Sequence, residues 1–188
     1  MRLFITALAC FITINAVAQK ATCIKVNLTD ALVNRYSIGI EHNLNSKTSL
    51  AVELNYLHKK IDLESPHPRY PYLSQIQKRG IILEPQFRYY ISDNLQKGLY
   101  TSIAGFFGYG CYDHDSNSLN NNQKYWSALG SSLYAGYQLK IGKVLLDNYF
   151  GFTIAENNYP LPYQESTAIL PPPNGIRLSA GIRLGYKL

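Results

Sequence analysis

The stretch GIRLSAGIRLGYKL, Gly175–Leu188, alternates between two kinds of residue. Apolar or small side chains occupy every second position, and the positions between them hold small residues and three bases, Arg177, Arg183 and Lys187. A period of two is the pattern of a β-strand, because successive side chains point to opposite faces. The stretch therefore predicts a strand with one apolar face and one small, basic face.

The same period recurs along the chain in stretches separated by Gly-, Pro- and Asn-rich segments. Seven further strands are predicted at 24–28, 35–43, 48–58, 80–91, 98–112, 127–140 and 143–155. Most are long enough to cross a bilayer at a tilt, which takes roughly 9 to 11 residues. Pro85 lies within one of them and predicts a β-bulge, because proline cannot donate to the ladder.

The expected connections differ in length in a regular way. After the first, short connections at 44–47, 92–97 and 141–142 alternate with long ones at 59–79, 113–126 and 156–174. Short turns at one end and long loops at the other are typical of transmembrane barrels. The fold class expected is all-β, an antiparallel eight-stranded transmembrane β-barrel with short periplasmic turns and long outer loops.

The first residues have the composition of an export signal. Arg2 precedes an apolar run, and Ala16-Val17-Ala18 supplies small residues at the expected cleavage site. We expect a cleaved signal peptide at 1–18 and an outer-membrane barrel at 19–188. No later run approaches the ~18 apolar residues of a transmembrane helix. The expected location is the bacterial outer membrane.

Tyrosines fall near both ends of the predicted strands on the outward-facing parity. An apolar ring with a polar hydroxyl suits the interface between membrane and water, so this placement predicts two aromatic girdles. The residues are Tyr36, Tyr56 and Tyr109 towards the long loops, and Tyr89, Tyr137 and Tyr186 towards the short turns.

Charged residues on the opposite parity are expected to point into the barrel. An eight-stranded barrel is just wide enough for side chains to fill its interior, and isolated charges there would be costly, so the acids and bases should pair. The predicted lumen network is a structural plug made of Lys25, Glu41, Glu53, Glu84, Arg88, Asp147, Arg177 and Arg183.

Four short motifs resemble a known family. EPQFRYY (84–90) resembles the P-x-[LF]-R-Y-[YW] strand of a small outer-membrane barrel family of Bacteroidetes known as a domain of unknown function. IKVNL (24–28), GIE (39–41) and GIRLGY (181–186) resemble its opening, second and closing strands. The resemblance covers most of 24–188. It implies an eight-stranded outer-membrane barrel and transfers no catalytic residue.

One enzymatic alternative rests on HDSN at 114–117, which resembles the H-x-S-N stretch of outer-membrane lipid A deacylases. His114 would be the base and Ser116 the nucleophile of an acyl hydrolase. The orienting acid of that family is missing here, where the corresponding region reads YWSA (125–128). We therefore expect a non-enzymatic protein and keep the lipid A-modifying hydrolase as the alternative. A small pore is a third hypothesis.

The expected function is envelope integrity, or binding and anchoring of a partner by the surface loops. Proline-stiffened aromatic residues make contact surfaces at low entropic cost. In the loops these contact residues are Arg69, Tyr70, Tyr72, Tyr159 and Tyr163. The expected partners are outer-membrane lipid, lipopolysaccharide and a surface or periplasmic protein. The +6 charge is scattered, which argues against nucleic acid.

The sequence predicts neither a cofactor nor a metal site. The histidines show no ligand spacing, and Cys23 lies far from Cys111. These two cysteines fall at opposite ends of non-adjacent predicted strands. We therefore expect them to remain unpaired thiols.

Overall fold

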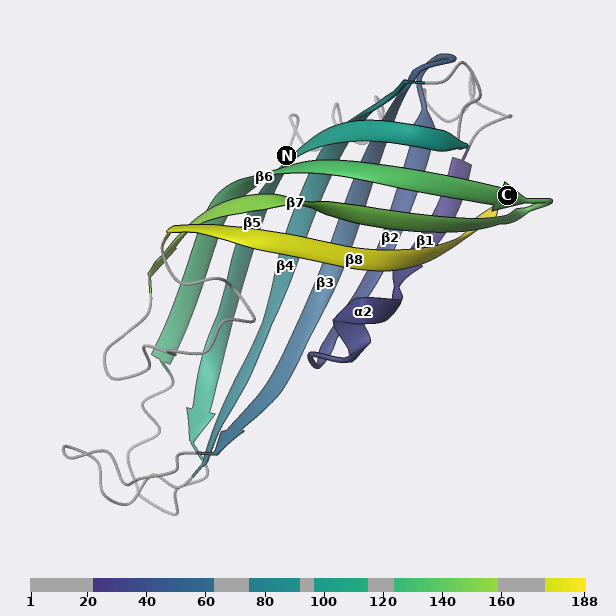
Figure 1. Cartoon of the computed structure of the whole chain (residues 1–188). Coiled ribbons are helices and arrows are strands. Elements are labelled where there is room, and N and C mark those ends of the chain that lie inside the picture. The colour runs from purple at the N-terminus through teal and green to yellow at the C-terminus, as the bar shows by residue number, and fades with distance from the viewer. Residues whose placement is uncertain (1–21, 63–74, 92–96, 115–123, 159–174) are drawn as a thin grey trace, which may run out of the picture.

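The computed structural model describes residues 22–62, 75–91, 97–114, 124–158 and 175–188 (Figure 1). Eight strands and one short helix make up these residues. They are β1 (Thr22–Asn27), α2 (Leu28–Ala31), β2 (Arg35–Asn43), β3 (Thr48–Asp62), β4 (Gln75–Tyr90), β5 (Gly98–His114), β6 (Lys124–Ile141), β7 (Val144–Asn158) and β8 (Gly175–Lys187).

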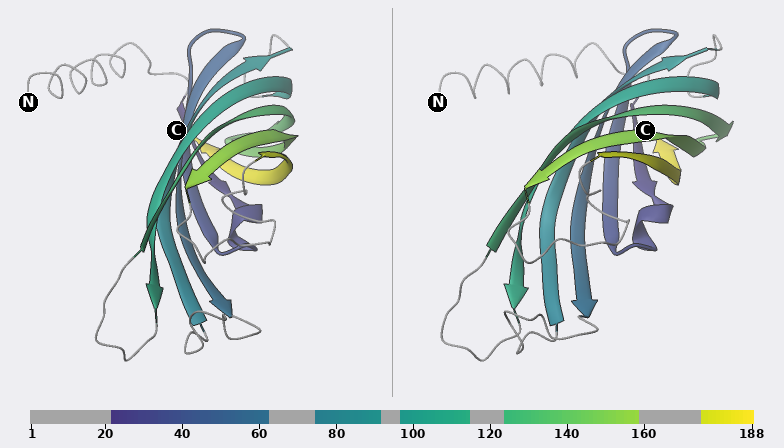
Figure 2. Two further views of the ribbon diagram at one scale, coloured as in Figure 1. Left: turned by 90° about the vertical axis from the view of Figure 1, so that its left-hand side faces the viewer. Right: turned by 60° about the vertical axis from the view of Figure 1, so that its left-hand side comes forward.

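The strands form a closed antiparallel barrel in the order β1 to β8, with β8 pairing back onto β1. Figure 2 shows that the strands are tilted in the same sense as they follow one another around the barrel. A closed sheet leaves few unpaired edges, which an open sheet of this size would expose. Among the described residues, the helical part is too short and too polar to cross a membrane.

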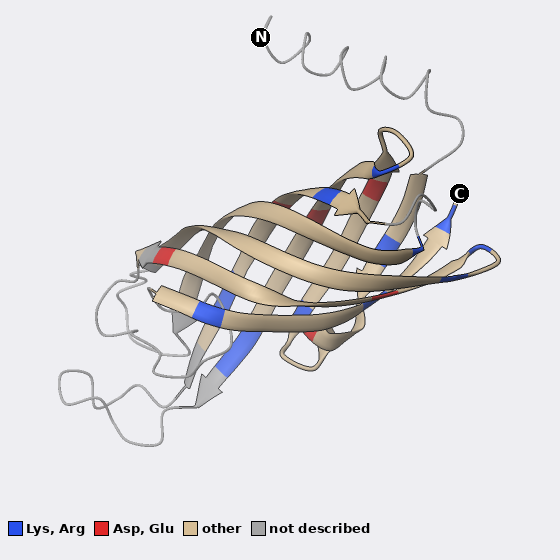
Figure 3. Ribbon diagram, turned by 45° about the horizontal axis from the view of Figure 1, so that its top comes forward, with Lys and Arg blue, Asp and Glu red and all other residues tan. Residues whose placement is uncertain are grey.

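Burial alternates along each strand with the parity of the sequence. In β6, Ser132 is 3% exposed, Leu133 is 61% exposed and Tyr134 is 6% exposed. The outward residues are mainly large and apolar, whereas the inward ones include nearly all the buried charged and polar side chains together with aromatic and small residues. Figure 3 shows how sparsely charged residues occur along the strands. The barrel is therefore apolar outside and carries its charged side chains inside, beside buried aromatic clusters.

The strand boundaries extend beyond the predicted ones mainly at one end of the barrel. We call this the loop end, where 63–74, 115–123 and 159–174 connect the strands, and the opposite end the turn end. At the loop end, β3 and β4 stay paired from Leu57 opposite Gly80 to Asp62 opposite Gln75. The prediction stopped earlier because the apolar alternation ends there, although backbone pairing continues without it.

The bulge predicted at Pro85 is wrong. Leu83 pairs with Phe107, and Gln86, three residues later, pairs with Ala104, three residues earlier, so the register with β5 is unbroken. On the other side Pro85 pairs with Val52 of β3. The missing N–H therefore removes ladder contacts to β5 locally, and no residue is inserted into the strand.

The strand pairing in the barrel wall is short beside β1, which has six residues. Cys23–Asn27 pair with Lys187–Arg183, and beyond Arg183 the described part of β8 pairs with β7 alone. The short helix α2 lies between β2 and β8 there, and the Ile182 N–H donates to Thr29 Oγ1 at 3.3 Å (Figure 1). We call this place, between α2 and residues 175–182 of β8, the seam.

A left-handed residue returns the chain from α2 to the sheet. Asn34 has a φ of 57°, a conformation that asparagine tolerates better than most residues. Its carbonyl accepts a hydrogen bond from the His58 N–H at 3.1 Å. The backbone therefore joins the ladder to β3 immediately before β2 begins at Arg35.

Candidate functional site: the barrel lumen

Two bases and two acids form a compact ion-pair cluster in the turn-end half of the lumen. Lys25 Nζ lies 2.6 Å from Glu41 Oε2 and 2.8 Å from Asp147 Oδ2. Arg88 Nη1 lies 3.1 Å and 2.8 Å from the same two oxygens. All four side chains are at most 4% exposed. Four strands, β1, β2, β4 and β7, are thereby cross-linked through their side chains.

Neutral polar groups complete this cluster. The Tyr90 hydroxyl donates to Glu41 Oε1 at 2.6 Å, and the Tyr100 hydroxyl donates to Asp147 Oδ1 at 2.5 Å. Lys25 Nζ also donates to Gln138 Oε1 at 2.6 Å. Buried charges need such saturation, because each missing hydrogen bond leaves a desolvated group uncompensated. The cluster therefore fills the turn-end half of the lumen with a network of ion pairs and hydrogen bonds.

A second ion pair lies nearer the middle of the barrel. Arg183 Nε donates to Glu53 Oε2 at 2.8 Å. The guanidinium stacks over the Tyr149 ring, 3.8 Å from its centroid, which is a cation–π geometry. Arg183 Nη1 is 4.0 Å from Asp147 Oδ2, so this residue links the pair to the turn-end cluster.

Six of the eight predicted lumen charges thus meet in ion pairs, and two do not. Glu84 accepts hydrogen bonds from Gln86 Nε2 at 2.8 Å and from the Tyr134 hydroxyl at 3.3 Å. Arg177 is partly exposed nearer the loop end, and its Nη1 is buried without a hydrogen-bond partner. Neither forms an ion pair within the described part of the chain.

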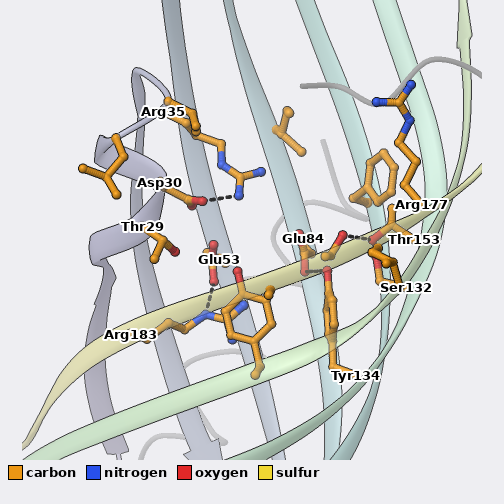
Figure 4. A pocket seen from close by; sticks show the side chains of 18 residues that line it. Thr29, Asp30, Arg35, Glu53, Glu84, Ser132, Tyr134, Thr153, Arg177 and Arg183 are labelled. Atoms are coloured by element: carbon orange, nitrogen blue, oxygen red, sulfur yellow. Dashed lines mark hydrogen bonds and ion pairs between the residues drawn. The ribbon is translucent and has the colours of Figure 1, made fainter. Parts of the chain in front are cut away.

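A cavity of about 350 Å³ lies towards the loop end of this network. Figure 4 shows that the side chains lining it come from α2 and from strands around the barrel, with Arg177 on the opposite side of the view from Arg35 and Arg183. Charged residues lining it are Asp30, Arg35, Glu53, Glu84, Arg177 and Arg183, and the remaining walls include Tyr134, Tyr149, Ser132 and Thr153. Ser132, Thr153 and Ser179 form a chain of hydroxyl contacts at 2.9 and 2.8 Å along one wall.

Sequence reasoning missed the part of this cavity built by α2. Asp30 is buried there, pairs with Arg35 and accepts a hydrogen bond from Ser37. It falls between two predicted strands, where no periodicity assigns a side chain to the lumen. The sequence does contain one signal for this position. Asp30 follows closely after a short alternating strand and precedes Arg35 by five residues.

The loop-end half of the lumen contains an aromatic cluster that the sequence also did not reveal. Lys78 Nζ lies 5.3 Å from the Tyr112 ring centroid and 5.2 Å from that of Trp126. Apolar side chains that include Leu57 and Ile82 pack in the same cluster. Lys78 had been assigned to a long loop, so its inward position could not be anticipated.

The six predicted girdle tyrosines all lie on the outer face. Tyr36 pairs with Tyr56 across β2 and β3, and Tyr109 stacks on Tyr125 with centroids 5.8 Å apart. Tyr89, Tyr137 and Tyr186 are 45%, 44% and 50% exposed towards the turn end.

The chain was compared with protein families, curated proteins and solved structures. A family model described as "Protein of unknown function (DUF3575)" matches residues 3–166. The chain belongs to this family. The match includes the predicted signal segment and ends before β8. No curated protein and no solved structure matches the chain.

Membership of DUF3575 assigns no chemistry. Of the predicted catalytic pair, the structure describes His114 and not Ser116. His114 is the last residue of β5, and Ser116 lies outside the described residues. The predicted loop contact residues Arg69, Tyr70, Tyr72, Tyr159 and Tyr163 also lie outside them.

The cysteines and metal ligands can be placed in part. Cys23 in β1 and Cys111 in β5 are not joined by a disulfide. Among the described residues, histidine, cysteine and acidic side chains form no group suited to a metal ion.

Proposed function

We propose that this chain is a bacterial outer-membrane protein of the Bacteroidetes type, exported through a cleaved signal peptide at 1–18. In this proposal the turn end faces the periplasm and the loop end faces outwards. The barrel is a non-enzymatic scaffold that supports the envelope and presents its loops to a protein partner or to lipopolysaccharide.

This proposal rests on the distribution of polar and apolar side chains, which is the reverse of that in a soluble protein. Large apolar side chains such as Ile103 and Leu133, 59% and 61% exposed, cover the outer face, while Glu41 and Asp147 are fully buried inside. Soluble monomers rarely expose a contiguous apolar patch larger than a few hundred Å². A closed barrel with an apolar exterior suits a bilayer, because its strands satisfy their backbone groups through their neighbours, apart from the β8 edge at the seam.

The plugged lumen favours a scaffold over a pore. Lys25, Arg88, Glu41 and Asp147 are bonded to one another, and ions passing through would have to separate them. Separating buried pairs costs several kcal/mol. The part of the molecule that remains for recognition is the loop end, where the longest connections lie.

Site-specific photo-crosslinking in intact cells tests this function. A photoreactive residue replaces Tyr70 or Tyr163 in the outer connections, and a matched control replaces Tyr137 at the turn end. We expect one discrete protein, or lipopolysaccharide, to be captured from the loop positions and not from position 137. Identical capture from all three positions would contradict recognition by the loops.

Two further measurements separate the scaffold from its alternatives. Lipid A mass spectra with and without the protein should be identical, because we propose no hydrolase. A lipid A species that loses an acyl chain only when His114 and Ser116 are intact would establish the enzyme instead. Planar-bilayer recordings should show no stepwise conductance, and steady channels would establish a pore.

A further inference from the structure

The cavity beside α2 reaches both faces of β8. Ser179 and Arg183 line it from the inward face, whereas Leu178 and Ala180 line it from the outward face. Alternate residues of a strand point to opposite sides of the sheet, and the lining includes both sets, so the cavity extends to the edge of the strand. The edge of β8 lies at the seam, where β1 no longer pairs with it. The cavity therefore extends from the lumen to the seam, and Figure 4 shows its lining residues on α2 and β8.

Three arginines that line this cavity have guanidinium nitrogens without acceptors. Arg35 Nε, Arg177 Nη1 and Arg183 Nη1 are buried, and none has a hydrogen-bond partner in the described part of the chain. Arg183 is only 3% exposed, and its Nη1 lies 4.0 Å from Asp147 Oδ2, beyond hydrogen-bond distance. Buried donors left unpaired are costly. All three residues line one cavity, which indicates a ligand that brings acceptor oxygens.

Among the three acids and three bases that line the cavity, one acid and one base form no ion pair within the described part of the chain. Asp30 pairs with Arg35, and Glu53 pairs with Arg183. Glu84 is held by Gln86 and Tyr134 instead of by a base. Arg177 therefore faces the cavity with its charge available to an anion, and a guanidinium suits phosphate oxygens better than most groups.

The seam itself is apolar. Leu32 at the end of α2 is 83% exposed, and Ile176 and Leu178 on β8 are 70% and 66% exposed. These side chains flank the route from the cavity to the outer face. A hydrocarbon chain attached to an anion in the cavity would leave between them and reach the surrounding lipid.

We propose that this cavity binds the phosphate group of a membrane phospholipid, whose acyl chains leave through the seam. Arg177 contacts the phosphate directly, and Arg183 and Arg35 supply further donors. A cavity of about 350 Å³ accommodates a headgroup and not a whole lipid, since ligand pockets span roughly 300 to 1,000 Å³. The proposal rests on membrane insertion as part of the proposed function, but not on any loop partner.

Titration of the folded, full mature chain in neutral detergent, followed by native mass spectrometry, tests this site. Three probes separate the contributions: dioleoyl phosphatidic acid, dioleoylglycerol with the same chains but no phosphate, and inorganic phosphate without chains. The variant is Arg177→Gln, which removes no hydrogen bond or ion pair formed within the described part of the chain. Its matched control is Arg79→Gln, an exposed arginine on β4 outside the cavity lining.

We expect phosphatidic acid to bind more tightly than either partial probe. Arg177→Gln should weaken it about tenfold, which corresponds to about 1.4 kcal/mol. Arg79→Gln should leave the affinity unchanged. Equal losses in both variants, or equal affinity for dioleoylglycerol, would overturn the phosphate site. Inorganic phosphate binding as tightly as phosphatidic acid would overturn the route through the seam.

The heat-dependent gel shift of the folded barrel is recorded for every sample before titration. A chain that fails to fold or insert contradicts the proposed function itself. A folded, inserted chain with no preference for phosphatidic acid contradicts only the lipid site.

Discussion

Asp147 is the acid on which the turn-end cluster depends most. Replacing it with asparagine keeps the shape of the side chain and removes its charge. Lys25 and Arg88, both 2.8 Å from Asp147 Oδ2, would then share Glu41 as their one remaining carboxylate at ion-pair distance. One buried positive charge would be left without compensation.

The expected loss follows from these distances. At an effective dielectric constant of about 20, each 2.8 Å contact is worth roughly 6 kcal/mol of gross attraction. Most of this is offset, because desolvating each ion costs several kcal/mol. Removing one partner of a buried pair destabilises a protein by about 3–5 kcal/mol, and we expect Asp147→Asn near the middle of that range.

Urea unfolding of the barrel in phosphatidylcholine vesicles measures this loss. Trp126, the single tryptophan of the chain, is 1% exposed inside the barrel and reports unfolding by fluorescence. Ser102→Ala is the control, because its buried hydroxyl has no hydrogen-bond partner among the described residues and its loss should change stability little. A loss below about 1 kcal/mol for Asp147→Asn would refute the cluster as a source of stability.

Two further substitutions test packing and facing in the same unfolding assay. A Cβ at Gly151 would lie 2.0 Å from the Leu133 carbonyl oxygen, whereas one at Gly105 would have 3.9 Å to its nearest neighbour. Gly151→Ala should therefore cost about 1–3 kcal/mol and Gly105→Ala much less; similar losses would contradict the packing. Leu133→Arg near mid-strand should cost about 2–4 kcal/mol, and Ile141→Arg at the turn end about 0–1 kcal/mol. Equal costs at the two depths would contradict a bilayer around β6.

Much of the fold was predictable because the period of two is a direct consequence of strand geometry. The bounds of β2 agree with the prediction at both ends, and the inward parity of Glu41 and Asp147 follows from their apolar neighbours. The interruption at Pro85 could not be judged from sequence, because whether a lost N–H shifts the register depends on both neighbouring strands.

The site was predictable in composition but not in pairing. Sequence parity selects Glu84 and Arg177 as lumen charges, yet which acid meets which base depends on strand stagger around the barrel. The seam was not foreseen, because it arises from the shortness of β1 relative to β8. A helix of four residues, α2, has no periodicity from which it can be recognised.

Oxygen and nickel-chelate accessibility of spin labels along β6 in lipid vesicles tests the central claim most directly. With Cys23 and Cys111 replaced by serine, single labels are placed at each position from 131 to 136. The account predicts high oxygen accessibility with low nickel accessibility at 131, 133 and 135, and low accessibility to both at 132, 134 and 136. High nickel accessibility at 131, 133 and 135 would place the outer face in water and contradict a membrane-embedded barrel.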